Sequence, residues 1–402
     1  MTRWLSNRFG MLGVLALVLG LALGACGDNT ATTAPAVTTA ATSATTAAAT
    51  TAAAAAAATT AAATSATTAA ATTAAAASTT AAAAANSGTA TGTLTILGTP
   101  QEDWVKATAE AFQKKTGIKT NYIRLSAGEA LARIKAEKGN PSFSVWWGGP
   151  ADQFIDAKNQ GLLETYKSPA AEKIPTQYKD PDANWTGIYV GTLGFASNKE
   201  LLAKKGLKAP TSWDDLLKPE FKGQVVVAHP ASSGTSYTML STILQLRGEA
   251  AGWEYMKKFH SQVFQYTKVG AAPGEIAGRG EALVGIIFSH DTIKYVKQGY
   301  PLELSFPLEG TGYEIGGLAI IKGAKQPVEA KMFYDWALSK EAQEIGAATQ
   351  SFQLPTNPEA KVDSNSIPLD KVKTIAYDFV SSGKNREARL KKFTEEIAPA
   401  PK

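Results

Sequence analysis

Cysteine is almost absent from this sequence, because Cys26 is the single cysteine in 402 residues. A chain with one cysteine cannot form an internal disulfide or a cluster of thiolate metal ligands. The three histidines lie far apart in the sequence and match no helical metal-binding spacing such as HExxH. We therefore expect neither a metal site nor a cofactor.

An excess of one charge sign is also lacking. The chain has 40 basic and 35 acidic residues, the two signs are interspersed, and Lys and Arg never form a run of five. Proteins that bind nucleic acid usually concentrate positive charge in such runs or patches. The charge pattern therefore predicts that nucleic acid is not a partner.

The motifs of several large enzyme classes are missing as well. The sequence contains no P-loop and no GxSxG motif. Residues 310–316 resemble a dinucleotide-binding fingerprint, but the last glycine spacing is one residue too long and an apolar strand follows instead of a helix. The carboxyl groups of Asp291 and Glu314 could act as acid and base in glycoside hydrolysis, which remains the enzyme alternative. Otherwise we expect no enzyme activity.

The first 25 residues have the pattern of a secretory signal peptide. Arg3 and Arg8 precede an apolar stretch at residues 11–23, and small residues lead from there to Cys26. The stretch of about 13 residues is shorter than the roughly 20 that span a bilayer. Small residues before a cysteine resemble the bacterial lipobox, so we predict that Cys26 is lipidated and anchors the protein. The alternative is an ordinary cleavage site beside a chance cysteine.

Residues 26–90 differ in composition from the rest of the chain. No charged residue occurs between positions 29 and 101, and residues 30–85 are almost entirely Ala and Thr. Such a sequence lacks the large side chains that offset the entropy of ordering. We predict a disordered tether, whose threonines could also carry glycans.

The remainder shows strand-like runs that alternate with amphipathic helices. Predicted strands at residues 94–97, 120–124 and 143–147 alternate with predicted helices at 102–115, 127–138 and 152–160. The pattern restarts with strands at 224–228, 264–268 and 283–289 and a helix at 235–246. Two more strands, at 302–306 and 314–321, precede an end expected to be all helical. This order predicts two α/β units with ligand-binding loops at the carboxyl ends of their strands.

Four motifs resemble the extracellular solute-binding proteins of ATP-binding cassette (ABC) importers. They are RLSAGEAL at 124–131, WWGGPA at 146–151, ASSGTSY at 231–237 and EGTGYEIG at 309–316. The branch that they resemble includes proteins for ferric iron, hexose phosphate, phosphonate and thiamine. The resemblance implies a type II periplasmic-binding-protein fold, with two α/β lobes joined by two crossing segments near residues 192–198 and 307–314.

On this basis residues 91–195 and 308–402 would form lobe 1, and residues 196–307 would form lobe 2. The resemblance also implies a permease and an ATPase as separate chains. The protein would be extracytoplasmic, in the periplasm or at the cell surface, held to the membrane by the lipid on Cys26, and we expect a monomer.

The candidate ligand residues indicate an anion. Ferric members of the branch typically hold iron with adjacent tyrosines, and this chain has no such pair. Ser233, Gly234 and Thr235 follow a predicted strand and open a helix, whose N–H groups accept anions. Ser126 opens another helix, although with Glu129 it forms a capping box that could explain it without a ligand.

A second group of residues suits a polyol. His290, Asp291 and Glu314 match a pattern of sugar-phosphate binders in this branch, and carboxylates accept protons from sugar hydroxyls. Helix capping and an ion pair with a lysine are the alternatives. Trp147, beside Gly148, is predicted to stack on the apolar face of a sugar. We therefore expect a sugar phosphate or another phosphate ester, with phosphonate, thiamine or ferric iron as alternatives.

Overall fold

The computed structural model describes residues 92–401. The predicted signal peptide, Cys26 and the predicted tether up to residue 90 lie outside these residues. The described chain begins with three strand–helix pairs and a two-residue strand: β1 (Thr93–Gly98), α1 (Glu102–Thr116), β2 (Lys119–Arg124), α2 (Ala127–Ala136), β3 (Val145–Pro150), α3 (Ala151–Asn159) and β4 (Leu163–Glu164). The predicted alternation is thus confirmed in this part of the chain.

The long strand β5 (Thr186–Asn198) is buried along its whole length. It is followed by α4 (Lys199–Lys204), β6 (Val225–Ala228), α5 (Gly234–Arg247), α6 (Glu249–His260), β7 (Val263–Thr267), α7 (Ala272–Gly278), β8 (Val284–Phe288), α8 (Ser289–Lys297) and β9 (Leu302–Ser305). These elements form the second α/β unit that the sequence predicted, and they include two short helices that we did not expect, α4 and α7.

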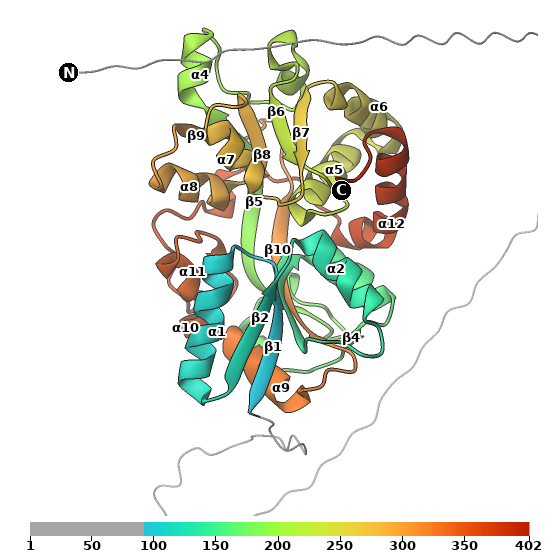
Figure 1. Ribbon diagram of the computed structural model, residues 1–402, viewed down its shortest axis with the longest axis vertical. Helices are drawn as coiled ribbons and strands as arrows, with labels where there is room; N and C mark the ends of the chain where they lie inside the picture. Colours follow the sequence, from blue (N-terminus) through green and yellow to red (C-terminus); the bar gives the residue numbers. More distant parts are fainter. Residues whose placement is uncertain (1–91, 402) are drawn as a thin grey trace, which may run out of the picture. The chain divides into compact units, whose positions relative to one another are not determined.

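The sheet is divided into two halves that share β5. The order is β2-β1-β3-β10-β5-β8-β6-β7, where β10 spans Tyr313–Ile321. The first half comprises β2, β1, β3, β10 and the first part of β5, which pairs with β10 up to Thr192. The second half comprises β8, β6, β7, β9 and the rest of β5, which pairs with β8 and β9 from Leu193 onward. Figure 1 shows β5 and β10 running between the two halves.

The neighbours of β1 and β6 are parallel, whereas β10 runs antiparallel to β3 and β5. The carboxyl ends of the parallel strands in each half therefore face the region between the halves (Figure 1). Each half has its own apolar core, with Trp104, Phe112 and Phe333 in the first and Trp213, Tyr237 and Phe259 in the second.

The C-terminal part differs from the all-helical end that the sequence predicted. The helices α9 (Pro327–Ala337), α10 (Lys340–Gln343) and α11 (Ile345–Ala348) are followed by the short strand β11 (Leu354–Pro355) and a largely irregular stretch. The prediction was wrong here because Pro355, Pro358 and Pro368 each remove a backbone donor and interrupt helical pairing.

The last helix, α12 (Phe379–Glu396), contacts both halves. Near its start, the position of a Cβ at Gly383 would be 2.6 Å from the carbonyl oxygen of Asp152, in the first turn of α3. Near its end, Phe393 belongs to the core of the second half. The helix therefore packs across the junction of the two halves.

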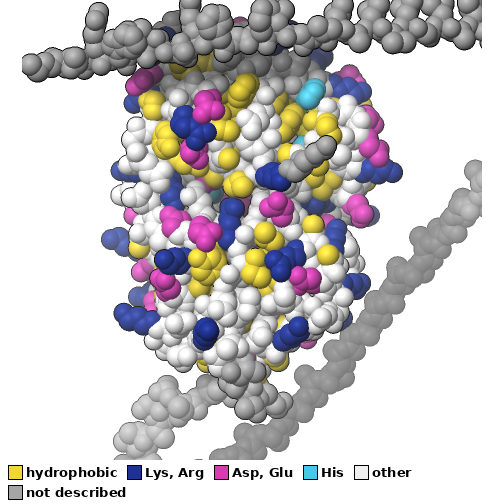
Figure 2. Space-filling view, in the orientation of Figure 1, with side chains coloured by type: hydrophobic (Ala, Val, Ile, Leu, Met, Phe, Trp, Pro, Cys, Tyr) yellow, Lys and Arg dark blue, Asp and Glu magenta, His cyan; other side chains and the backbone are white. Residues whose placement is uncertain are grey.

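No helix among residues 92–401 is long and apolar enough to cross a membrane. On the face shown in Figure 2, basic and acidic side chains are mixed without a patch of one sign. This distribution agrees with the charge pattern of the sequence.

Candidate ligand-binding site

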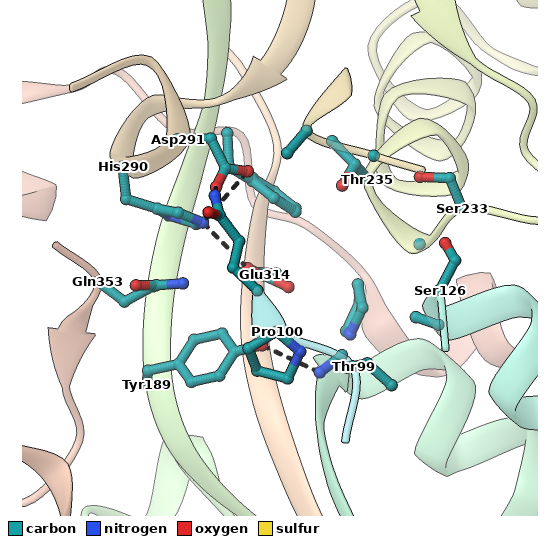
Figure 3. Close-up of a pocket in the computed structure, with 18 of the residues that line it drawn as sticks. Thr99, Pro100, Ser126, Tyr189, Ser233, Thr235, His290, Asp291, Glu314 and Gln353 are labelled. Carbon is teal, nitrogen blue, oxygen red and sulfur yellow. Dashed lines mark hydrogen bonds and ion pairs between the residues drawn. The ribbon is translucent and has the colours of Figure 1, made fainter. Parts of the chain in front are cut away.

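A polar cavity of about 60 Å³ lies between the two halves, in front of β5 and β10 (Figure 3). Its lining comes from the loops at the strand ends and from the helices that follow them. The residues that line it are Thr99, Pro100, Gln101, Arg124, Ser126, Ala127, Gly149, Pro150, Tyr189, Ser233, Gly234, Thr235, Gly270, Ala271, Phe288, His290, Asp291, Glu314 and Gln353. Most of the predicted site residues are thus brought to one place.

The start of α5 supplies hydroxyl groups from the second half. Ser233 is the N-cap, and its side chain accepts a hydrogen bond from the backbone N–H of Ser236. A Cβ at Gly270 would lie 2.2 Å from Oγ1 of Thr235, so this loop packs directly against the hydroxyl. The close packing holds Ser233 and Thr235 at the cavity wall.

The start of α2 faces α5 from the first half. Ser126 and Glu129 form the predicted capping box, and Ser126 also lines the cavity. The backbone N–H of Gly128 donates to the carbonyl oxygen of Ser232 at 2.9 Å, which joins the two halves directly. Two helix N-termini, each with a positive dipole end, therefore lie at the same side of the cavity (Figure 3).

Arg124 contributes a positive charge to the cavity, although we did not predict it as a site residue. It is the last residue of β2, and its guanidinium donates to the carbonyl oxygens of Pro100 at 3.0 Å and Thr99 at 3.4 Å. Burial lowers the pKa of Arg124, and the carboxylate of Asp291 opposes this effect. A guanidinium stays protonated under these conditions, so it provides a fixed cation for an anionic ligand.

The other side of the cavity holds the predicted polyol-binding group. Nε2 of His290 lies 3.7 Å from Oδ2 of Asp291 and 3.9 Å from Oε1 of Glu314. These distances are too long for hydrogen bonds. The side chains therefore point toward a common space and keep capacity for another partner (Figure 3).

The protonation of this group follows from its burial. Burial, reinforced by the charge of Asp291, raises the pKa of Glu314 well above its usual value. Burial lowers the pKa of His290. The raised pKa favours the protonated form of Glu314 and the lowered pKa favours neutral His290, and each of these forms can donate a hydrogen bond to a ligand oxygen.

Trp147 and Gly148 do not line the cavity, although we predicted both as ligand residues. The Trp147 ring packs edge-on against Trp104, with 5.0 Å between centroids, inside the core of the first half. A Cβ at Gly148 would meet the ring of Pro100 at 2.4 Å. Because β3 is buried on both faces, its sequence could not indicate whether either tryptophan faces the cavity.

The other two histidines lie away from the cavity. His229 is buried, and its Nε2 lies 2.9 Å from the carbonyl oxygen of Ala398. His260 lies on α6, where its Nδ1 is 3.1 Å from the hydroxyl of Tyr266. Both contacts join parts of the fold and involve no cavity residue.

Local sequence patterns gave little indication that several of the cavity residues belong to the site. Gln101 follows β1, in a loop that the strand-end rule could have singled out, and its side-chain amide donates to Oδ1 of Asp291. Tyr189 lies in the middle of β5, where its hydroxyl accepts from the backbone N–H of Gly149 at 3.0 Å. Gln353 precedes β11 in a stretch without periodicity. Only folding brings the last two to the site.

No group of three or more His, Cys, Asp or Glu residues within positions 92–401 is arranged to hold a metal ion. The cavity instead offers hydrogen-bond donors, one guanidinium and two acidic side chains. This set suits an anionic, hydroxylated small molecule better than a hard cation.

The fold and the cavity together define a type II periplasmic binding protein, in which two α/β halves enclose a small solute. The chain belongs to the bacterial extracellular solute-binding protein family, whose profile matches residues 151–383. Proteins of this kind are the substrate-binding subunits of ABC importers. The chain is therefore an extracytoplasmic binding protein and not an enzyme.

Three relatives illustrate the similarity. The periplasmic binding protein AfuA from Actinobacillus pleuropneumoniae, solved with exogenous fructose 6-phosphate bound, is 42% identical, with a TM-score of 0.74 over 76% of this chain and 98% of AfuA. The periplasmic binding protein P5PA is 36% identical, with a TM-score of 0.74 over 76% of this chain and 99% of P5PA. An uncharacterized protein from Haemophilus influenzae is 41% identical over 77% of this chain and 92% of its own length.

Proposed function

We propose that this substrate-binding subunit captures a sugar phosphate, or a closely related phosphate ester. This proposal depends on the observation that the two sides of one cavity carry chemically different groups. Hydroxyls and helix N-termini at Ser126, Ser233 and Thr235 lie at one side, and His290, Asp291 and Glu314 lie at the other (Figure 3). The first group suits a phosphate and the second suits sugar hydroxyls. AfuA, solved with fructose 6-phosphate, is in keeping with this assignment.

We further propose that the two halves act as lobes that close on the ligand. Lobe 1 would comprise residues 91–195 and 308–402, and lobe 2 residues 196–307. The strand β5 and the segment before β10 would serve as the crossings, since both pass from one half to the other. Because α12 contacts both halves, we expect its packing to shift as well when the lobes open.

Isothermal titration of the purified protein tests the ligand class. We expect saturable binding of fructose 6-phosphate or glucose 6-phosphate and much weaker binding of the free sugars. Titrations with 2-aminoethylphosphonate, thiamine and ferric citrate separate the alternatives. Binding of only the iron complex would refute the phosphate assignment.

Substitution of Thr235 tests the phosphate end. Thr235→Val removes one hydroxyl donor and should weaken fructose 6-phosphate binding roughly tenfold, as expected for a hydrogen bond to a charged group. Fructose binding should change little. Thr165→Val, at an exposed position that does not line the cavity, is the matched control. An equal loss for the phosphorylated and unphosphorylated sugars would refute this placement.

We also propose that a lipid on Cys26 anchors the protein, with residues 26–90 as its tether. The support is the signal-peptide pattern and the single cysteine at its end. In bacteria that produce the protein, Cys26→Ser should abolish labelling by a fatty acid and move the protein from the membrane to the soluble fraction. Labelling that persists in the variant would exclude Cys26 as the attachment site.

A further inference from the structure

The first turn of α1 contacts α8 directly, beside the cavity but outside it. The ammonium group of Lys294 on α8 donates to Oδ2 of Asp103 on α1 at 2.5 Å. It also reaches the carbonyl oxygen of Thr349, which follows α11, at 3.4 Å. Neither Asp103 nor Lys294 lines the cavity.

The partners of Lys294 come from the opposite half. Lys294 belongs to α8 in the second half, whereas α1 packs on the sheet of the first half and α11 lies beside α1 (Figure 1). The bond from Gln101 to Asp291 crosses between the halves in the same region, two residues before Asp103. These contacts can exist together only when the halves approach as they do in this structure.

Because Lys294 is buried, its ion pair with Asp103 is energetically important. The Lys294 side chain is 6% exposed, whereas that of Asp103 is 50% exposed. Lysine is rarely buried without an anionic partner, because the lost hydration must be compensated. Without Asp103, the ammonium would keep, among residues 92–401, the Thr349 carbonyl as its hydrogen-bond partner. Lys294 can be buried in this arrangement of the two halves because Asp103 meets it there.

We propose that Asp103 and Lys294 form an electrostatic clasp that stabilises the closed form and raises ligand affinity without touching the ligand. The clasp also holds α8 against the first half, and α8 carries His290 and Asp291 in its first turn. The proposal rests on the proposed capture of a solute by closure of the two halves. The apparent affinity of such a protein scales with the fraction of molecules that can reach the closed form.

The decisive experiment measures association and dissociation of fructose 6-phosphate by stopped flow. Asp103→Asn leaves a buried ammonium without its anion, so dissociation should become about tenfold faster while association changes little. Lys106→Met, which removes the exposed pair of Lys106 with Glu110 on the same helix, should change neither rate. Unchanged dissociation in Asp103→Asn would overturn the clasp.

A double variant distinguishes an ion pair from general damage to α1. Adding Lys294→Met to Asp103→Asn removes the charge that was left unpaired, so dissociation should return toward the wild-type rate. A helix damaged by Asp103→Asn would not be repaired by a change on α8. Additive effects of the two substitutions would therefore also overturn the clasp.

Hydrogen exchange of the ligand-free full chain tests the clasp without any ligand. Asp103→Asn should speed exchange in peptides that cover the first turns of α1 and α8, and Lys106→Met should not. If fructose 6-phosphate fails to bind the wild-type protein, the proposed function fails while this measurement still decides on the clasp. Equal exchange in the wild type and Asp103→Asn would refute it.

Discussion

Gly191 positions His290, a predicted ligand residue, although it contributes no side chain itself. It lies on β5 directly opposite Glu314 of β10, and His290 packs over it. A Cβ at this position would lie 2.5 Å from Nδ1 and 2.6 Å from Cε1 of the imidazole. The bare backbone of β5 therefore allows His290 to reach the cavity floor.

Gly191→Ala should push His290 out of place. Overpacking of this kind costs about 1–3 kcal/mol, so we expect roughly tenfold weaker binding of fructose 6-phosphate in titration calorimetry, together with a lower melting temperature. In the double variant Gly191→Ala/His290→Ala, the melting temperature should recover and binding should not. Wild-type affinity in Gly191→Ala would show that His290 does not need this space.

At the scale of elements, two helix N-termini from different halves meet with almost no space between them. A Cβ at Gly128 on α2 would lie 2.2 Å from the carbonyl oxygen of Ala231, and a Cβ at Gly234 on α5 would lie 2.6 Å from the ring of Pro150. Glycine at both positions lets the dipole ends of α2 and α5 converge on one side of the cavity. The positive potential there depends on this approach.

Gly128→Ala should lower both stability and affinity. Alanine favours a helix over glycine by about 0.5–1 kcal/mol, but a Cβ 2.2 Å from the backbone oxygen of Ala231 forces the two helix ends apart, so the melting temperature should fall. The added methyl group would obstruct the contact with Ala231, so affinity for fructose 6-phosphate should fall. Calorimetry and thermal melting of one preparation test both parts, and unchanged affinity would contradict the role assigned to this contact.

At the scale of the whole molecule, α12 covers a buried acid at the junction of the halves. Asp152, in the first turn of α3, is fully buried, and one of its oxygens lies 3.2 Å from the hydroxyl of Tyr377. Burial raises the pKa of Asp152 to about 7, although Arg386 of α12 acts in the opposite direction. The junction therefore contains a group that changes charge near neutral pH.

The stability of the protein should fall as the pH rises through this range. The folded-state pKa of Asp152 lies above its ordinary value of 3.8, so between about pH 4 and pH 7 the native state keeps a proton that the unfolded state has lost. At about 1.4 kcal/mol per pKa unit, this contributes a loss of roughly 4 kcal/mol, fully developed above pH 7. Urea unfolding at several pH values measures it.

Asp152→Asn should remove this contribution and flatten the dependence of the unfolding free energy on pH. Asp370→Asn, at an exposed position, should leave the dependence as it is in the wild type. A slope in Asp152→Asn equal to that of the wild type would assign the pH dependence to other groups.

The elements that carry the site could be predicted because their signals are local. An apolar stripe with buried Val105, Ala109 and Phe112 and the stop at Gly117 indicated α1, and a serine before Glu129 indicated the start of α2. Ser126, Ser233 and His290 could be proposed because each follows a strand, and strand ends are where such sheets bind ligands. Trp147 could not be placed, because a strand buried on both faces has no polar alternation.

The sequence by itself determined the alternation of strands and helices, the family resemblance and the chemistry of the strand-end loops, because all of these depend on residues close together in the chain. Only the tertiary structure decided that Arg124, Tyr189 and Gln353 share a cavity, and that Asp103 meets Lys294, 191 positions away. Such contacts arise where two halves, each with its own core, are joined by shared strands. Their geometry depends on the packing of the whole sheet, which no local pattern encodes.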